Sequence, residues 1–278
     1  MVINEMYPPF QLTQTVSHTF LGRDGQEAIE TEEVLVEHML EVYINDKLTM
    51  KLVCIPENLA EMVLGRLLSE GIIKNSDDVE ALTIDQSGTR ADVVLVAEAP
   101  ESEAADFDSQ AEDFVEITPS ACTSNHILND YFVKYKDTPV LTSIPWKKEW
   151  IFALADKFAS GMPIHSKTWS THSAFLAQDD TLLFSCEDIG RHNALDKAIG
   201  YAIRNHVDLG KCILYSSGRV PTDMVMKVIH AGVPVFASKA SLTGEAVELA
   251  RNYNLTLICA ARRDRMKLYT GPVPEDAQ

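Results

Sequence analysis

The feature that most restricts the fold of this chain is a regular alternation of strand-like and helix-like segments in its second half. Short apolar runs have the length of buried strands, and amphipathic segments beginning at Asn193, Pro221 and Thr243 separate them. Strands joined by helices of this length form a sheet with a parallel part and with helices on both faces. The second half is therefore predicted to be an α/β domain with a mixed sheet.

The first half has a different pattern, with two hairpins and one helix. Alternating segments on either side of Asn45-Asp46 predict the first hairpin, and segments on either side of Ser87-Gly88 predict the second. Between them, Asn58 is expected to cap a helix that ends at Gly71. This part of the chain is predicted to be a smaller α+β module.

An acidic stretch without a basic residue separates the two parts. Residues 98–113 contain few large apolar side chains, which is typical of a solvated connection. We therefore expect an N-terminal α+β domain over residues 1–113, which ends in this linker, and an α/β domain over residues 114–278.

Composition and charge exclude several classes of protein. The formal net charge of −17 argues against general binding to nucleic acid or to an anionic membrane, because phosphate binding needs a basic surface. No apolar run reaches membrane-spanning length, and residues 1–10 lack the order of a secretory signal. The five cysteines are scattered and form no C-x-x-C pair, so we expect reduced thiols and a cytoplasmic location.

The most polar junction between a strand and a helix lies at residues 185–197, around Gly190. Ligands of α/β sheets usually bind at the carboxyl ends of strands, which is where such a junction lies. Asn193 is expected to cap the following helix, with Asp196 in its first turn. A solvated, self-paired turn is the alternative interpretation. The candidate ligand-binding residues are Glu187, Asp188, Arg191, His192 and Asn193.

Further junctions contribute small and basic residues. Ser217, Gly218 and Arg219 join a strand to a helix, and the helix start offers free N–H groups that can hold a phosphate. Another junction follows at 238–244, and a basic cluster at 262–265 follows the last predicted strand. In so acidic a chain these groups suggest an anion site, although a scatter of surface arginines is the alternative.

Two side chains have possible chemical roles outside these junctions. Cys122 lies in a small, polar segment beside His126, where a thiolate could be favoured, but most single cysteines are inert small hydrophobes. The other cysteines border apolar strands and are expected in the core.

His172 leads into a strand, and a histidine at a strand edge is more often structural than catalytic. The chain has neither the H-x-E nor the P-C-x-x-C motif of zinc deaminases, and no catalytic metal is predicted.

Together these segments resemble the FdhD family, the formate dehydrogenase accessory sulfurtransferases. Residues 187–197, Glu-Asp-Ile-Gly-Arg-His-Asn-Ala-Leu-Asp-Lys, are similar to the family block E-D-V/I-G-R-H-N-A-x-D-K. Other blocks follow in the family's order and spacing, and the resemblance covers most of residues 30–270. These blocks are 56–73, Ser217-Gly218-Arg219, Lys227 with 231–234, 246–250 and 265–269.

The resemblance implies a cytidine-deaminase-like α/β domain without the deaminase metal, in a protein that forms homodimers. Such proteins take sulfur as a persulfide from a cysteine desulfurase. They pass it to the bis-molybdopterin guanine dinucleotide molybdenum cofactor, for formate dehydrogenase or a related molybdoenzyme. The persulfide cysteine of the family falls on Cys122. Its cofactor-binding stretch falls on Ala260, Ala261, Arg262, Arg263, Asp264 and Arg265.

The chain departs from the family pattern at these presumed sites. Asn125 stands where the family has the second cysteine of its C-x-x-C motif, so no local disulfide can resolve the persulfide. The family motif T-G-G-x-H is replaced by Thr168-Trp169-Ser170-Thr171-His172, and S-A-P-T by residues 240–243. The alternative function is therefore a divergent chaperone that binds the molybdenum cofactor or a guanine nucleotide without transferring sulfur.

Overall fold

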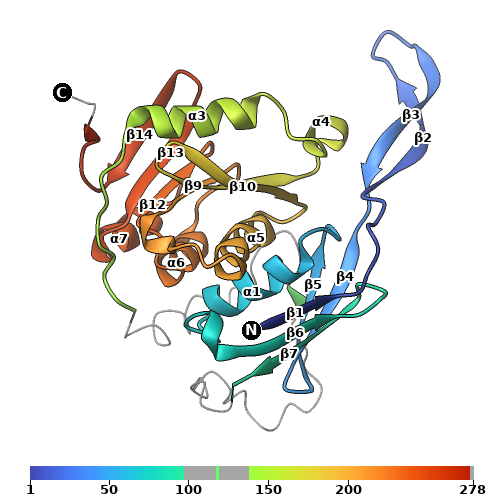
Figure 1. Cartoon of the computed structure of the whole chain (residues 1–278). Helices are drawn as coiled ribbons and strands as arrows, with labels where there is room; N and C mark the ends of the chain where they lie inside the picture. Colours follow the sequence, from blue (N-terminus) through green and yellow to red (C-terminus); the bar gives the residue numbers. More distant parts are fainter. Residues whose placement is uncertain (97–116, 119–137, 276–278) are drawn as a thin grey trace.

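The computed structural model describes residues 1–96, 117–118 and 138–275, and its main elements are two sheets of six strands each (Figure 1). A separate two-stranded hairpin stands beside them. Helices lie between the sheets and on the outer face of the C-terminal sheet (Figure 1). The chain is thus a mixed α/β protein.

The C-terminal sheet carries the alternation that the sequence predicts. Its parallel part is β11, β12 and β13, while β9, β10 and β14 pair antiparallel at its two sides. The mixed sheet is therefore confirmed. Its strand order is β10 (Thr181–Asp188), β9 (His172–Gln178), β11 (Ile213–Ser216), β12 (Val235–Ser238), β13 (Thr256–Arg262) and β14 (Arg265–Thr270).

Helices cover both faces of this sheet, as predicted (Figure 1). Alternate side chains of each strand point to opposite faces. Phe175 and Tyr215 pack with helix α3 (Lys148–Ala159), whereas Leu176 and Leu214 join the core formed with the helices of the other face. Those helices are α5 (Arg191–Arg204), α6 (Thr222–His230) and α7 (Gly244–Asn252).

The N-terminal sheet contains both predicted hairpins. The turn of the first hairpin has Asn45 and Asp46 at φ 47° and 66°, the left-handed conformation that tight hairpin turns require. Helix α1 (Leu59–Ser69) follows this hairpin. The strand order is β1 (Val2–Glu5), β6 (Val79–Ile84), β7 (Arg90–Leu95), β4 (His38–Ile44), β5 (Lys47–Cys54) and β8 (Ile117–Thr118).

The cap expected for α1 is wrong in its detail. Asn58 does precede the helix, but its side chain makes no capping hydrogen bond and its backbone is left-handed, at φ 55°. Gly71 follows the helix at φ 71° as expected, and its N–H donates to the carbonyl of Leu68. The end of α1 was therefore predicted better than its beginning.

The two sheets are joined through a close contact between α1 and α5. A Cβ atom on Gly65 would lie 1.8 Å from the carbonyl oxygen of Asp196, and one on Gly200 would lie 1.7 Å from that of Glu61. Only glycine allows the two backbones to approach so closely. The apolar residues of both sheets form one continuous core around this contact. The predicted domain boundary at residue 113 lies outside the described residues and stays a prediction.

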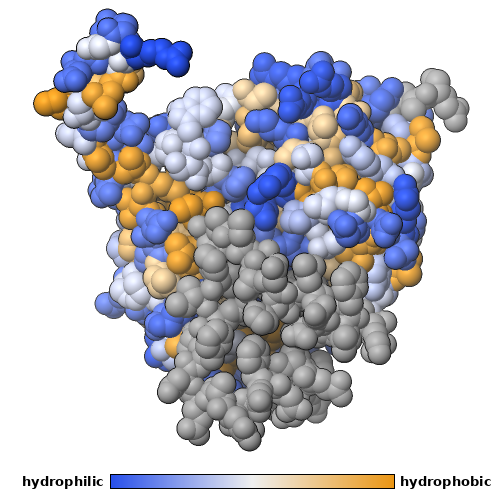
Figure 2. Space-filling model, turned by 180° about the vertical axis from the view of Figure 1, so that it is seen from behind, coloured by the Kyte–Doolittle hydropathy of each residue, from blue (hydrophilic) through white to orange (hydrophobic). Residues whose placement is uncertain are grey.

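The remaining hairpin, β2 (Thr13–Leu21) and β3 (Glu27–Leu35), projects from the body. Figure 2 shows it from the opposite side, with hydrophobic and hydrophilic surface side by side. Leu21 and Ile29 on this hairpin are 70% and 84% exposed. The sequence did not single out this hairpin or strand β14. In the part of the chain that the structure describes, no helix is long and apolar enough to span a bilayer.

Candidate ligand-binding site

The main cavity of interest lies where β11, β12 and β13 end, beside α3 and the short helix α4 (His165–Thr168). It has a larger lobe of about 490 Å³ and a smaller lobe of about 310 Å³, and we call the two together the pocket. Phe158, His165, Trp169 and Lys239 line both lobes. Both the location and the size are those of ligand sites in α/β proteins.

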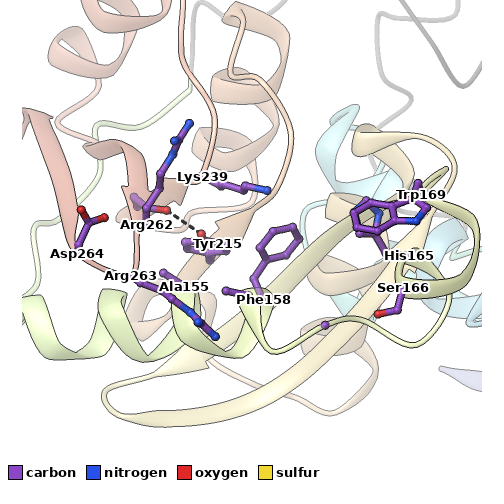
Figure 3. Close-up of a pocket in the computed structure, with 13 residues that line it drawn as sticks. Ala155, Phe158, His165, Ser166, Trp169, Tyr215, Lys239, Arg262, Arg263 and Asp264 are labelled. Atoms are coloured by element: carbon purple, nitrogen blue, oxygen red, sulfur yellow. Dashed lines mark hydrogen bonds between the residues drawn. The ribbon is translucent and has the colours of Figure 1, made fainter. Parts of the chain in front are cut away.

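The larger lobe combines aromatic rings with cationic groups (Figure 3). The ammonium of Lys239 lies 4.5 Å from the centre of the Phe158 ring. Lys239 and Arg262 form no salt bridge with any described residue, so their charges are available to a ligand. Arg263 also lines this lobe, and its Nε lies 3.4 Å from Asp156 Oδ1. This lobe is suited to an anion attached to a flat ring.

The smaller lobe is more polar and contains two of the predicted site residues, His172 and Ser217. The Ser217 hydroxyl accepts a hydrogen bond from the N–H of Ser173 at 2.9 Å and lies 3.3 Å from Nδ1 of His172. Burial lowers the pKa of His172, and the neighbouring cations, Arg191 first, lower it further. A bound anion would offset this repulsion, because it would stabilise the protonated imidazole.

Glu187 holds the wall of the pocket without lining it. Its buried carboxylate accepts hydrogen bonds from the N–H groups of Ile164 and His165, at 2.8 and 2.7 Å, and from the Thr171 hydroxyl at 2.8 Å. These bonds anchor the segment 164–171, which carries α4. Charge-assisted bonds of this kind are stronger than neutral ones, so Glu187 fixes the shape of this wall.

Asp188 and Asn193 lie in the interior. The Asp188 carboxylate pairs with the ammonium of Lys197 at 2.7 Å and accepts from the N–H of Ile55 at 3.1 Å. Asn193 donates to Asp188 at 2.9 Å and to the carbonyl of Val53 at 2.8 Å. Burial alone would lower the pKa of Lys197. The pKa is raised instead, mainly because the charge and hydrogen bond of Asp188 stabilise the ammonium. These residues tie α5 to the N-terminal sheet.

Two local expectations for α5 are wrong for the same reason. The helix begins at Arg191 with Gly190 as its N-cap residue, so Asn193 is inside it and does not cap it. Asp196 lies beyond the first turn and is fully buried. It accepts from the ammonium of Lys227 at 3.1 Å and from the hydroxyl of Ser69 at 2.8 Å. Both side chains have partners on distant segments of the chain. Predictions of helix capping consider only neighbouring residues and therefore miss such partners.

The smaller lobe is not lined by four of the predicted residues, although the charges of the first, second and last act on His172 within it: Arg191, His192, Gly218 and Arg219. Nε2 of His192 lies 2.9 Å from the Asp223 carboxylate. Burial raises the pKa of Asp223, but the hydrogen bond and charge of His192 outweigh this, and the pKa is lowered. A Cβ on Gly218 would lie 2.7 Å from Cβ of Arg191, so this glycine leaves room for the arginine.

The predicted cofactor-binding stretch, residues 260–265, spans the end of β13, the turn that follows and the first residue of β14. Ala261, Arg262, Arg263 and Asp264 line the larger lobe, and the carbonyl of Ala261 accepts a hydrogen bond from the Tyr215 hydroxyl at 2.9 Å. Ala260 is in the left-handed conformation, at φ 50°, and its N–H donates to the carbonyl of Ala240. Ala260 and Arg265 flank the lining residues rather than joining them.

Sequence reasoning missed the residues that join the two lobes. Phe158 has the spacing of the apolar face of a helix, and Lys239 belongs to the junction at 238–244, so neither position by itself indicates a ligand. His165 and Trp169 gave no periodic signal. The signal that could have identified Trp169 is a large aromatic residue between polar neighbours in Thr168-Trp169-Ser170-Thr171.

Four of the five cysteines lie in the described part of the chain, and all four are buried. Cys54, Cys186, Cys212 and Cys259 are buried, which confirms their predicted place in the core. Burial raises the pKa of Cys186 and Cys259 to about 12 and that of Cys212 to about 11, and it raises the pKa of Cys54 as well. Cys122 lies outside the described residues. Among the described residues, no cluster of three or more His, Cys, Asp or Glu side chains could hold a metal ion.

Comparison with known proteins gives a consistent result over most of the chain. The chain is 31% identical over 250 residues to a protein named sulfur carrier protein FdhD from Bacillus pumilus (strain SAFR-032), covering 89% of this chain and 92% of that protein. It is also 31% identical over 271 residues to the protein of the same name from Halalkalibacterium halodurans, covering 96% of each.

A solved structure supports the fold. The crystal structure of a putative formate dehydrogenase accessory protein from Desulfotalea psychrophila has a TM-score of 0.73 to this chain, at 21% identity, and the match covers 94% of this chain and 98% of that one. A family model, the FdhD/NarQ family, matches residues 35–274. The order of the sheets, the block at 187–197 and this match agree, and the chain belongs to the FdhD/NarQ family.

Proposed function

We propose that this protein is an accessory sulfur carrier for a formate dehydrogenase or a related molybdoenzyme. It accepts sulfur as a persulfide from a cysteine desulfurase and passes it to the bis-molybdopterin guanine dinucleotide molybdenum cofactor. The observation that carries the proposal is the similarity to proteins named sulfur carrier protein FdhD over nearly the whole length of both chains. We further propose that it works as a cytoplasmic homodimer.

The chemistry of the pocket supports a nucleotide-bearing cargo. A guanine dinucleotide offers phosphates and flat rings, and the larger lobe provides Lys239 and Arg262 close to the rings of Phe158 and Tyr215. The carboxylate of Asp264 at the rim is an acceptor suited to the N–H groups of a guanine edge. The residues present therefore fit one nucleotide end of the cargo.

The sulfur step itself is assigned to Cys122. Its thiolate attacks the outer sulfur of the desulfurase persulfide, so that a new sulfur–sulfur bond forms on Cys122 and the desulfurase cysteine leaves as a thiolate. The buried thiols support this choice, because a cysteine with a pKa of about 11 or 12 is almost entirely protonated near neutral pH. Cys122 is the remaining cysteine of the chain.

Release of the sulfur needs a partner that this chain does not supply locally. Asn125 replaces the second cysteine of the family motif, so reduction of the Cys122 persulfide to sulfide requires an external thiol. The same replacement favours a second candidate function, in which the protein binds and carries the cofactor without loading it with sulfur. The pocket serves that function equally well.

The deciding experiment is the intact mass of the protein after incubation with a cysteine desulfurase and cysteine. We expect the wild type to gain one sulfur atom, the Cys122→Ala variant to gain none, and the matched Cys212→Ala variant to gain one, because Cys212 is buried. The same Cys122→Ala protein should bind guanosine diphosphate as the wild type does. If the wild type gains no sulfur from a desulfurase that loads another acceptor, the carrier function is wrong and the binding function is favoured.

A further inference from the structure

The backbone and the side chain of Trp169 are both unusual. Its φ and ψ are 55° and 15°, the left-handed region that glycine and asparagine enter readily and bulky residues avoid. The residue is also 79% exposed, so burial of its indole does little to offset this backbone conformation. Strained residues of this kind cluster at ligand sites and persist only where surrounding contacts hold them.

The surrounding contacts do hold it. The N–H of Trp169 donates to the carbonyl of His165 at 2.8 Å, and the next hydroxyl, of Ser170, donates to the carbonyl of Thr168 at 2.8 Å. The buried Glu187 carboxylate anchors both sides of this turn, through the N–H of His165 and the hydroxyl of Thr171. The backbone of the turn that carries the indole is therefore anchored to the interior of the protein.

The indole lies where the two lobes of the pocket meet. Trp169 lines both lobes, and it makes an edge-to-face contact with the ring of His165, with centroids 5.4 Å apart and planes at 64°. Figure 3 shows Trp169 and His165 together on the α4 side of the pocket, with Phe158 between them and Tyr215. Lys239, which also lines both lobes, supplies a cation near this point.

We propose that Trp169 is a specificity-determining residue on which a flat heteroaromatic ring of the ligand, a purine or a pterin, stacks. The ring lies against the exposed indole while the attached phosphates reach Lys239 and Arg262. An indole offers a broad face to any such ring, and the cations offer charge to any phosphate. This inference rests on the proposed nucleotide-bearing cargo, and it assigns recognition of the ring to a residue that is not one of the candidate ligand-binding residues predicted from the sequence.

The experiment compares two probes, guanosine diphosphate and inorganic pyrophosphate, by calorimetry with the full chain. Trp169→Asn removes the ring and keeps a residue that accepts the left-handed backbone, whereas Trp169→Tyr keeps a ring. We expect the Asn variant to bind guanosine diphosphate about five- to 150-fold more weakly. The Tyr variant should retain most of the affinity, and both variants should bind pyrophosphate as the wild type does.

Fluorescence gives a second reading. The chain has three tryptophans. Guanosine diphosphate should quench emission in the wild type and in Trp150→Phe, a change on α3 away from the pocket lining, but not in Trp169→Asn. An unchanged melting temperature in Trp169→Asn will establish that the turn still folds.

The outcomes separate this inference from the proposed function. If the wild type and Trp169→Asn bind guanosine diphosphate equally, the stacking role is wrong and the nucleotide site stands. In that case, a change in the oligomeric mass of Trp169→Asn would assign the indole to a contact between proteins. An equal loss in the Tyr and Asn variants also overturns stacking. If the wild type binds neither probe, both the inference and the proposed cargo site fail.

Discussion

Two groups of charged residues in this protein have similar chemistry and opposite surroundings. The interior polar cluster, Asp188, Asn193, Asp196, Lys197 and Lys227, is buried between the two sheets, and each of its charges faces an opposite charge. The pocket cations, Lys239 and Arg262, are exposed and have no carboxylate partner among the described residues.

The comparison teaches that pairing and burial, rather than residue type, separate a structural group from a binding group. The family block at 187–197 looks like one site in the sequence, yet Asp188 and Lys197 serve the interior while Glu187 supports the pocket wall. A buried charge with a close partner stabilises the fold only as a pair, because removal of one partner leaves the other unpaired in a poorly solvated place. An exposed cation without a partner costs little and remains available to an anion.

The largest expected effect is on the interior polar cluster. Asp188→Ala should lower the free energy of unfolding by about 3–5 kcal/mol, because the Lys197 ammonium would stay buried without its carboxylate. Urea unfolding followed by circular dichroism measures this. The matched control is Glu41→Ala, which breaks an ion pair with Lys51 at the same separation of 2.7 Å on a part-exposed face. Its expected loss is below about 1 kcal/mol, and equal losses would remove the distinction between the two groups.

The next effect tests the residue that links the two groups. Glu187→Gln should lower the free energy of unfolding by about 1–3 kcal/mol, because an amide cannot accept all the hydrogen bonds that the carboxylate accepts. It should also weaken binding of guanosine diphosphate, since the segment that carries His165 and Trp169 would be held less firmly. The control is Glu33→Gln on the projecting hairpin, whose part-exposed carboxylate accepts hydrogen bonds from two hydroxyls, of Thr13 and Thr15. If Glu187→Gln loses stability but binds guanosine diphosphate as the wild type does, the anchoring of segment 164–171 by Glu187 does not contribute to binding.

The smallest effect is the pH dependence of the pocket. The pKa of His172 is lowered by burial and neighbouring cations, so the unfolded chain takes up a proton before the folded protein does. Stability should therefore fall as the pH drops from about 6.5, the ordinary histidine pKa, toward the folded pKa. A bound anion favours the protonated form, and affinity for pyrophosphate should rise over the same range. His172→Gln should flatten both profiles, and His206→Gln, on an exposed turn, should change neither.

The sequence predicted the parts of the fold whose signals are local. The signals for the helices, for the turn at Asn45-Asp46 and for the segment beginning at Thr243 all lie within a few residues of the elements they define. Thr243 precedes α7, and its Oγ1 accepts a hydrogen bond from the N–H of Ala246. The cap assigned to Asn193 failed because neighbouring sequence does not reveal a distant partner such as the carbonyl of Val53. The cap assigned to Asn58 failed because its backbone is left-handed and its side chain makes no capping hydrogen bond.

The candidate site was predictable only in part. The cationic turn after β13 and the residues His172 and Ser217 were identified because they follow or border strands at one edge of the sheet. Phe158, Trp169 and Lys239 come from three separate segments, and only the packing of α3 and α4 against the sheet brings them together. The sulfur-carrying role of Cys122 stays a prediction, because this residue lies outside the described residues.

The glycine contact between α1 and α5 has a consequence for how the chain must be made. Gly65 and Gly200 come from opposite halves of the sequence, and the backbone of each fills the space beside the other. During synthesis, the first sheet emerges with one face of α1 uncovered and cannot complete its core until α5 has left the ribosome. We therefore expect fragments that end before α5 to expose apolar surface and not to accumulate as folded proteins.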